Sequence, residues 1–157
     1  MLRRIAIEKA RKDWKSASNL LSLYLEIFMG DIDAWLELSR IYIGFKNFQM
    51  AAFCLEEAIL IRPQDYCLFI RYAEINYAMG TAQSVATARD YFAKVVNLIP
   101  QHPRSLFGLL QCNRVLKALL QQQSATSVEK EIDEIDREAG KKLEKLYDSS
   151  DISLFLC

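Results

Sequence analysis

The side chains that most often carry chemistry are few in this chain and do not cluster. The single histidine, His102, stands between Pro100 and Pro103, which favours a turn or helix-capping role over that of a catalytic base. The cysteines (Cys54, Cys67, Cys112 and Cys157) show no Cys-x-x-Cys spacing, and the five glycines are isolated. A hydrolase triad, a zinc site and a phosphate-binding loop therefore all lack their residues. We expect no enzyme, no metal and no cofactor, and we expect Cys54 to be a buried reduced thiol.

The elements that would position any site form a helical repeat, clearest over residues 31–65. Small and large apolar residues fall at the spacing of a tetratricopeptide unit of about 34 residues: Trp35, Leu38, Tyr42, Ala51, Leu55, Ala58 and Pro63. The alanines let two helices approach closely, and the proline ends the second helix. Asp31 and Asn47 are suited to cap the two helices. An ordinary helical bundle with a chance match is the less favoured alternative.

A second unit, over residues 66–102, repeats the pattern with Phe69, Tyr72, Ala88, Phe92 and Pro100. Because Pro63 and Pro100 are 37 residues apart, three residues are extra. We expect this insertion in the turn, within the uncharged residues 80–84.

The two ends of the chain are predicted to be less regular. Residues 1–30 form a partial repeat with a shortened first helix, so we expect either a fragment or an N-terminal face covered by a partner. Residues 103–147 form a degenerate repeat that opens at Pro103, followed by a capping helix with a narrow apolar stripe. A coiled-coil arm is the less favoured alternative for that helix. Residues 148–157 are a tail, which we interpret as a frayed chain end. A small docking peptide is the less favoured alternative.

From these patterns we predict an all-α protein. It is a tetratricopeptide-type α-solenoid of antiparallel helix pairs with about eight helices in one domain, residues 1–147.

The overall charge of the chain is balanced. Lysine plus arginine and aspartate plus glutamate number 20 each, so the formal net charge is zero and nothing directs the chain to nucleic acid. Residues 1–20 are locally basic, which we interpret as a solvated helix face. No uncharged apolar run is long enough to span a membrane.

Such a stack offers a concave groove lined mainly by the first helix of each pair. The repeat register selects the following groove residues: Leu36, Glu37, Arg40, Ile43, Ile70, Arg71, Glu74, Tyr77, Arg104, Phe107, Gln111 and Arg114. Arginine and aromatic residues often dominate protein interfaces. Chaperone-binding tetratricopeptide proteins hold a C-terminal carboxylate with lysine and asparagine at set positions. Here Leu36, Ile70 and Phe107, then Arg40, Glu74 and Gln111, occupy those positions, which argues against that use.

Beyond the generic repeat, several segments resemble subunit 2 of the endoplasmic reticulum membrane protein complex. They are AAFCLEE, RYAE, DYFAKVVNL and SLFGL, within a resemblance over roughly residues 3–116. The resemblance implies a scaffold without catalytic residues, peripheral on the cytoplasmic face of that membrane. It implies a role in inserting transmembrane segments, tail anchors included, by joining cytosolic and membrane subunits. Family members carry further repeats upstream, so we expect an N-terminally shortened version. A generic adaptor that binds a peptide or chaperone tail is the alternative.

Overall fold

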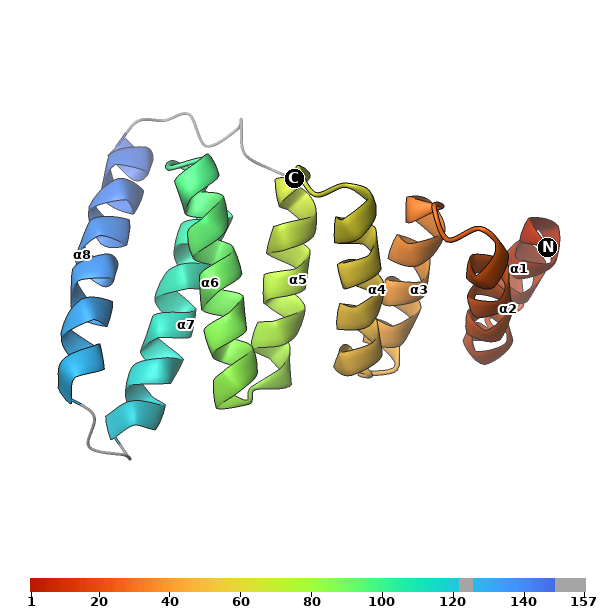
Figure 1. Cartoon of the computed structure of the whole chain (residues 1–157), viewed down its shortest axis with the longest axis horizontal. Coiled ribbons are helices and arrows are strands. Elements are labelled where there is room, and N and C mark those ends of the chain that lie inside the picture. The colour runs from red at the N-terminus through yellow and green to blue at the C-terminus, as the bar shows by residue number, and fades with distance from the viewer. Residues whose placement is uncertain (122–125, 149–157) are drawn as a thin grey trace. The chain divides into compact units, whose positions relative to one another are not determined.

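The computed structural model describes residues 1–121 and 126–148, with the side chains of residues 1–119 and 132–146. Within these residues there are eight helices and no strand (Figure 1). The helices are α1 (Leu2–Ala10), α2 (Trp14–Ile27), α3 (Ile32–Gly44), α4 (Phe48–Ile61), α5 (Tyr66–Met79), α6 (Ala82–Leu98), α7 (Pro103–Gln121) and α8 (Thr126–Asp148). The all-α prediction is confirmed. None of the described helices is both long enough and apolar enough to cross a membrane.

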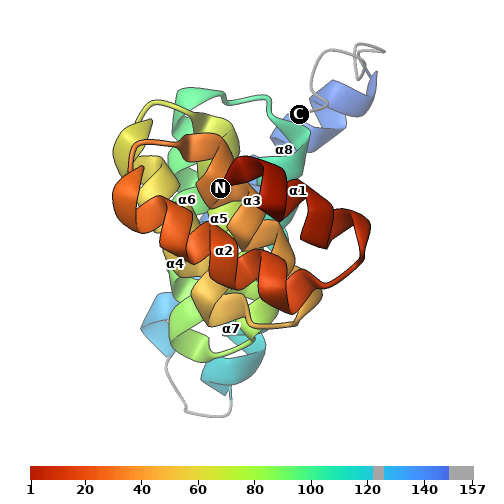
Figure 2. The same cartoon turned by 90° about the vertical axis from the view of Figure 1, so that its right-hand side faces the viewer.

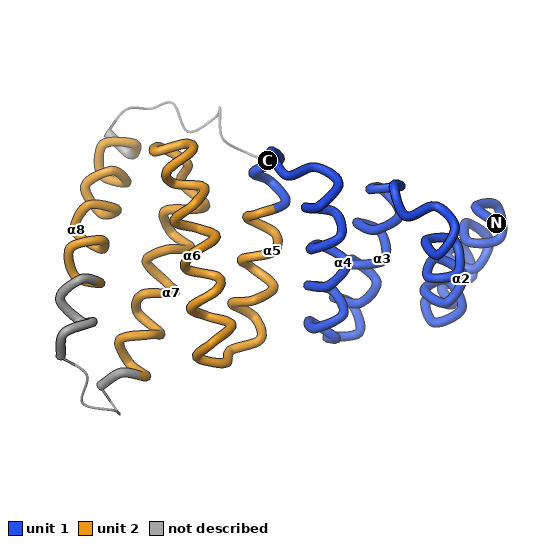
Figure 3. The backbone as a smooth tube through the Cα atoms, in the orientation of Figure 1, with its two compact units in different colours: residues 1–68 blue, residues 69–157 orange. Residues whose placement is uncertain are grey.

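The chain divides into two compact units, residues 1–68 and residues 69–157 (Figure 3). The boundary falls inside α5, within the second predicted repeat. The prediction of one domain over residues 1–147 stays a prediction. The predicted tail, residues 148–157, lies outside the described residues apart from the last residue of α8.

In the first unit, each helix packs against the next, and α3 and α4 form the closest pair (Figures 1 and 2). Ala17 and Leu21 of α2, Leu38 of α3 and Cys54 of α4 share one buried cluster. The small side chains at Ala17, Ala51 and Ala58, all fully buried, allow this close approach.

Trp35 is held inside the first unit rather than pointing into solvent. Its indole N–H donates to the carbonyl of Met29 at 2.8 Å. Its ring meets Phe53 edge-on, with 6.1 Å between the ring centroids. Trp35 is thus partly buried and packs against α4, the second helix of its own pair.

The helix starts in this unit are capped as predicted. The Asp31 side chain accepts from the backbone N–H of Ala34 at 3.2 Å, and the Asn47 side chain accepts from Met50 at 3.3 Å. Each cap satisfies a backbone donor that the first turn of a helix leaves without a partner. The Asp31 carboxylate also accepts from the Tyr24 hydroxyl at 2.9 Å, so it ties α2 to α3.

In the second unit, the prediction that the three extra residues lie in the turn is wrong. Gly80, with φ +72°, and Thr81 form the whole turn, and α6 already begins at Ala82. The Thr81 side chain accepts from the Ser84 N–H, and the Ser84 hydroxyl accepts from the Thr81 N–H, each at 3.1 Å. This reciprocal capping box starts the helix early. The extra residues therefore lengthen α6 to 17 residues, against 14 in α4.

The apolar stripe of α8 lies against α7. Ile132, Ala139, Leu143 and Leu146 are buried, whereas Ile135 is 40% exposed. The stripe is thus largely used within the chain, as a capping helix requires, and little of it remains for a coiled coil. The sequence also predicts a capping box at residues 126–129 and places Val128 at the start of the stripe; these side chains lie outside those that the structure describes.

A polar cluster fixes the α7–α8 contact. Lys117 of α7 donates to Asp133 at 2.6 Å and to Asp136 at 2.5 Å. The fully buried Asn113 donates to the other oxygen of Asp136 at 2.8 Å. Because these hydrogen bonds and ion pairs are directional, they fix how α7 and α8 are aligned along their lengths.

Candidate functional site

The residues of chemical interest are structural in this fold. His102 is 1% exposed, and its Nδ1 accepts from the Ser105 N–H at 3.2 Å, one residue before α7 begins. Burial, and then the charge of Arg104, lower the pKa of His102. The predicted capping role is therefore confirmed, and the imidazole is enclosed rather than facing a cleft.

The two buried cysteines, Cys54 and Cys112, are thiols outside any disulfide. Burial raises the pKa of Cys54 to about 12 and that of Cys112 to about 11. A thiol is nucleophilic only as thiolate, so both are unreactive at neutral pH. Among the described residues, no group of three potential ligands could hold a metal ion.

The four predicted groove residues of α3 divide between packing and surface. Leu36 packs against the buried cluster of Ile32, Ala58 and Leu68. Glu37 is half-buried and forms an ion pair with Lys9 of α1. Arg40 and Ile43 are exposed. The structure thus leaves Arg40 and Ile43 most available to a partner.

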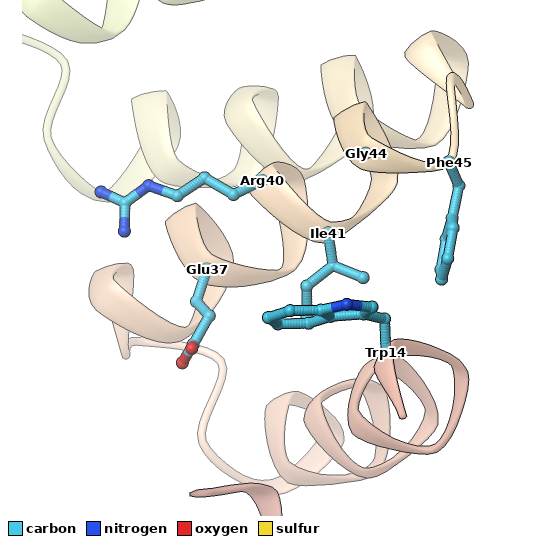
Figure 4. Close-up of a pocket in the computed structure, with 6 residues that line it drawn as sticks. All are labelled: Trp14, Glu37, Arg40, Ile41, Gly44 and Phe45. Carbon is cyan, nitrogen blue, oxygen red and sulfur yellow. The ribbon is translucent and has the colours of Figure 1, made fainter. Parts of the chain in front are cut away.

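Glu37 and Arg40 lie on the wall of a hollow of about 400 Å³, here called hollow A (Figure 4). It is lined by Trp14, Glu37, Arg40, Ile41, Gly44 and Phe45. The Trp14 indole lies against Ile41, with Phe45 to one side and Glu37 and Arg40 to the other. Trp14 is 43% exposed and Phe45 is 49% exposed, so hollow A presents aromatic surface to solvent.

Two equivalent turns place these aromatic rings. Lys12 and Lys46 both adopt left-handed backbone, with φ 61° and 57°. In each turn the next residue, Asp13 or Asn47, donates its N–H to the carbonyl five positions back and caps the following helix. Trp14 begins the helix after the first turn, and Phe45 opens the second. The repeated turn therefore sets the two aromatic sides of hollow A.

The groove residues predicted on α5 and α7 also divide into buried, ion-paired and exposed residues. Ile70 is 1% exposed, which corrects its assignment to the groove, because its side chain belongs to the packed interior. Glu74 accepts from the Arg104 guanidinium through both carboxylate oxygens, at 2.6 and 2.9 Å. This bidentate pair joins α5 to α7. Arg71 and Arg114 are exposed.

A smaller hollow of about 220 Å³, hollow B, collects five of the predicted residues in the second unit. It is lined by Glu74, Tyr77, Arg104, Phe107 and Gln111, together with Phe92 and Gly108. Gly108 leaves room for the buried Phe92 ring, since a Cβ at this position would lie 2.5 Å from the nearest atom of that ring. Tyr77 and Phe107 keep 36% and 43% of their surface exposed.

The sequence pattern misses Trp14, Ile41, Gly44 and Phe45 of hollow A, and Phe92 and Gly108 of hollow B. The repeat register selects only the groove-facing positions of the first helix of each pair. Trp14, Phe45 and Phe92 lie outside these helices, and the other three lie at positions of them that the register does not select. One signal was present: Lys12-Asp13-Trp14 and Lys46-Asn47-Phe48 repeat the same order of residue types at the two turns.

Comparison with known proteins agrees with this architecture. The family model of the EMC2 TPR-like repeat domain matches residues 1–100. The ER membrane protein complex subunit 2-A of Xenopus laevis is 40% identical over 107 residues, which cover 68% of this chain and 36% of that protein. The subunit 2 of Dictyostelium discoideum is 36% identical over 98 residues, which cover 62% and 30%. The TPR repeat protein oca3 of Schizosaccharomyces pombe is 30% identical over 121 residues, which cover 74% and 42%.

The chain spans 36% of the length of the Xenopus relative, so it corresponds to about a third of such a protein. Among solved structures, a double mutant of MamA matches with a TM-score of 0.61 at 14% identity, covering 95% of this chain and 93% of that one. A crystal structure of MamA matches with a TM-score of 0.55 at 11% identity, covering 90% and 95%. These structures support the fold alone. On the family match and the identity to its members, this chain belongs to the EMC2 TPR-like repeat family.

Proposed function

We propose that this chain is a non-enzymatic scaffold within the endoplasmic reticulum membrane protein complex, peripheral on the cytoplasmic face of the membrane. It joins cytosolic subunits to membrane subunits and so supports the insertion of transmembrane segments, tail anchors included. The observation that carries the proposal is the family match over residues 1–100, together with relatives that bear the name of subunit 2 of that complex.

The surface chemistry supports a binding role. Both hollows present aromatic rings beside arginines, and these are the residue types that most often dominate binding energy at interfaces. The two ion pairs of the site, Lys9 with Glu37 and Glu74 with Arg104, join α1 to α3 and α5 to α7, so they help to hold the helices beside each hollow in place. A preformed surface loses little conformational entropy on binding.

The test is affinity purification of the tagged chain from detergent-solubilised membranes, with partners quantified by mass spectrometry. We expect multi-pass membrane subunits and cytosolic subunits of one complex, and reduced insertion of a tail-anchored reporter when the protein is depleted. Recovery of soluble chaperones alone would favour the alternative, an adaptor for a chaperone tail, and would contradict the scaffold role.

A further inference from the structure

Hollow A is large enough to admit a bulky side chain and has an apolar lining suited to one. Its volume of about 400 Å³ lies within the range of about 300–1,000 Å³ that ligand pockets span. Trp14 and Phe45 form its sides and Ile41 and Gly44 its apolar floor (Figure 4). Aromatic surface left half exposed in a concave site gains most when an apolar group displaces its water. The interior of hollow A therefore favours an apolar or aromatic anchor.

The edge of hollow A is positively charged. The one carboxylate in its lining, Glu37, is paired with Lys9. Arg40 forms no ion pair with any residue in the part of the chain that the structure describes, and its guanidinium extends away from the Trp14 ring (Figure 4). The hollow thus has an unneutralised cation beside an apolar floor.

The turns that flank hollow A add to this charge. Lys12 precedes Trp14 by two residues, and Lys46 directly follows Phe45; both lysines are exposed. The nearby carboxylate of Asp13 is engaged as the α2 cap, accepting from the Ser16 N–H at 3.1 Å and from its hydroxyl at 2.8 Å. Opposite charge on a partner is therefore favoured along this edge, although the chain as a whole is neutral.

We infer that hollow A binds a segment of a partner protein in which one bulky apolar side chain is flanked by aspartate or glutamate. The apolar side chain enters between Trp14 and Phe45, and a flanking carboxylate pairs with Arg40. The inference rests on the proposed scaffold function and gives the chemistry of one partner contact. The required carboxylates are side chains, so a free C-terminus is not needed.

The test uses four synthetic peptides with acetylated and amidated ends, which combine a central phenylalanine or serine with flanking glutamates or lysines. Binding to the full chain is followed by NMR at the indole N–H of Trp14, assigned with Trp14→Phe. The indole of Trp35, bonded to Met29, serves as an internal reference for a site that should not move. We expect the phenylalanine peptide with glutamates to bind tightest. The two peptides that keep only one of these features should bind about three- to tenfold more weakly, and the serine peptide with lysines should bind weakest.

A charge reversal makes the test specific. In Arg40→Glu, the preference for the phenylalanine peptide with glutamates over the one with lysines should shrink, because Lys12 and Lys46 then remain as the cations beside hollow A. Arg62→Glu, the same charge change at an exposed position outside the lining of hollow A, should leave this preference unchanged. Equal affinity of the unaltered chain for both phenylalanine peptides, or an unchanged preference in Arg40→Glu, overturns the inference. The inference is also overturned if no peptide shifts the NMR signal of Trp14 but the chain binds anionic vesicles in a way that depends on Arg40.

The failure of this inference and the failure of the scaffold role give different results. If no peptide moves the Trp14 signal while membrane subunits still purify with the chain, the chemistry assigned to hollow A is wrong and the scaffold proposal stands. If the peptides bind in the expected order but only chaperones are recovered, the hollow is as inferred and the scaffold proposal fails.

Discussion

Replacing Gly108 by alanine tests whether the contact between α6 and α7 is as close as the structure has it. A Cβ at this position would lie 2.5–2.6 Å from three atoms of the Phe92 ring, closer than real Cβ contacts come. Phe92 is 3% exposed and is enclosed by its neighbours except where it lines hollow B, so its ring can move only by disturbing the packing or entering that hollow. Either the ring leaves its rotamer or the two helices separate, and both raise the free energy of the folded state.

Two opposing effects set the size of the change. In a helix interior, alanine is favoured over glycine by about 1 kcal/mol. Overpacking a well-filled core costs about 1–3 kcal/mol. Gly108→Ala should therefore range from neutral to about 2 kcal/mol less stable. Gly140→Ala is the matched control, since Gly140 is also within a helix and a Cβ there has nothing within 4 Å. It should be up to about 1 kcal/mol more stable.

The informative quantity is the difference between the two variants, about 1–3 kcal/mol, because helix propensity is common to both. Thermal and urea unfolding followed by circular dichroism measure it, and each kcal/mol corresponds to about 2–4 °C in a chain of this size. Adding Phe92→Leu to Gly108→Ala should recover part of the loss. If Gly108→Ala stabilises the protein as much as Gly140→Ala, the close approach of Phe92 to α7 is refuted.

Four further substitutions and measurements address the capping, the titration, the thiols and the groove. Asp31→Ala removes the α3 cap and should cost about 1 kcal/mol in urea unfolding, whereas Asp31→Asn, which can still cap, should cost less. Lys117 holds the pKa of Asp133 below its ordinary 3.8, so this pair stabilises the fold above that pH and the stabilisation is lost as the pH falls through the lowered pKa. Lys117→Met should therefore flatten the loss of stability measured from about pH 5 to about pH 3, and an unchanged slope would contradict the pairing. Cys54 should resist a thiol reagent at about pH 8 until urea unfolds the chain, because its thiolate is scarce and buried; rapid labelling of the native protein would show otherwise. Arg71→Glu should lower recovery of partner subunits at unchanged helix content, and equal recovery would remove Arg71 from the binding surface.

Local structure was predictable because short-range chemistry decides it. The side chains of Asp31 and Asn47 reach backbone donors three residues away, so the helix starts can be inferred without knowing the rest of the fold. Pro103 begins α7 for a similar reason, since a missing N–H costs nothing in a first turn. The family could also be inferred from the sequence, because several short segments resemble it at positions that the helical repeat pattern itself does not constrain.

The errors arose where local preferences competed. The uncharged stretch of residues 80–84, which begins with Gly80, predicts a turn that takes up the three extra residues. The Thr81–Ser84 capping box instead starts α6 at Ala82. Ile70 was assigned to the groove by register alone, yet it is buried. Register gives the face of a helix on which a residue lies, but not whether another element covers that face.

The sequence by itself determined that this protein is a stack of capped helix pairs belonging to a known repeat family, because spacing, small residues and caps act over a few residues. Only the tertiary structure decided which residues line the two hollows. It pairs Lys9 with Glu37 and Arg104 with Glu74, brings Trp14 beside Phe45 across 31 positions of sequence, and presses Gly108 against Phe92. Such contacts join separate helices, so their geometry depends on how each helix is rotated and packed, which no local pattern encodes.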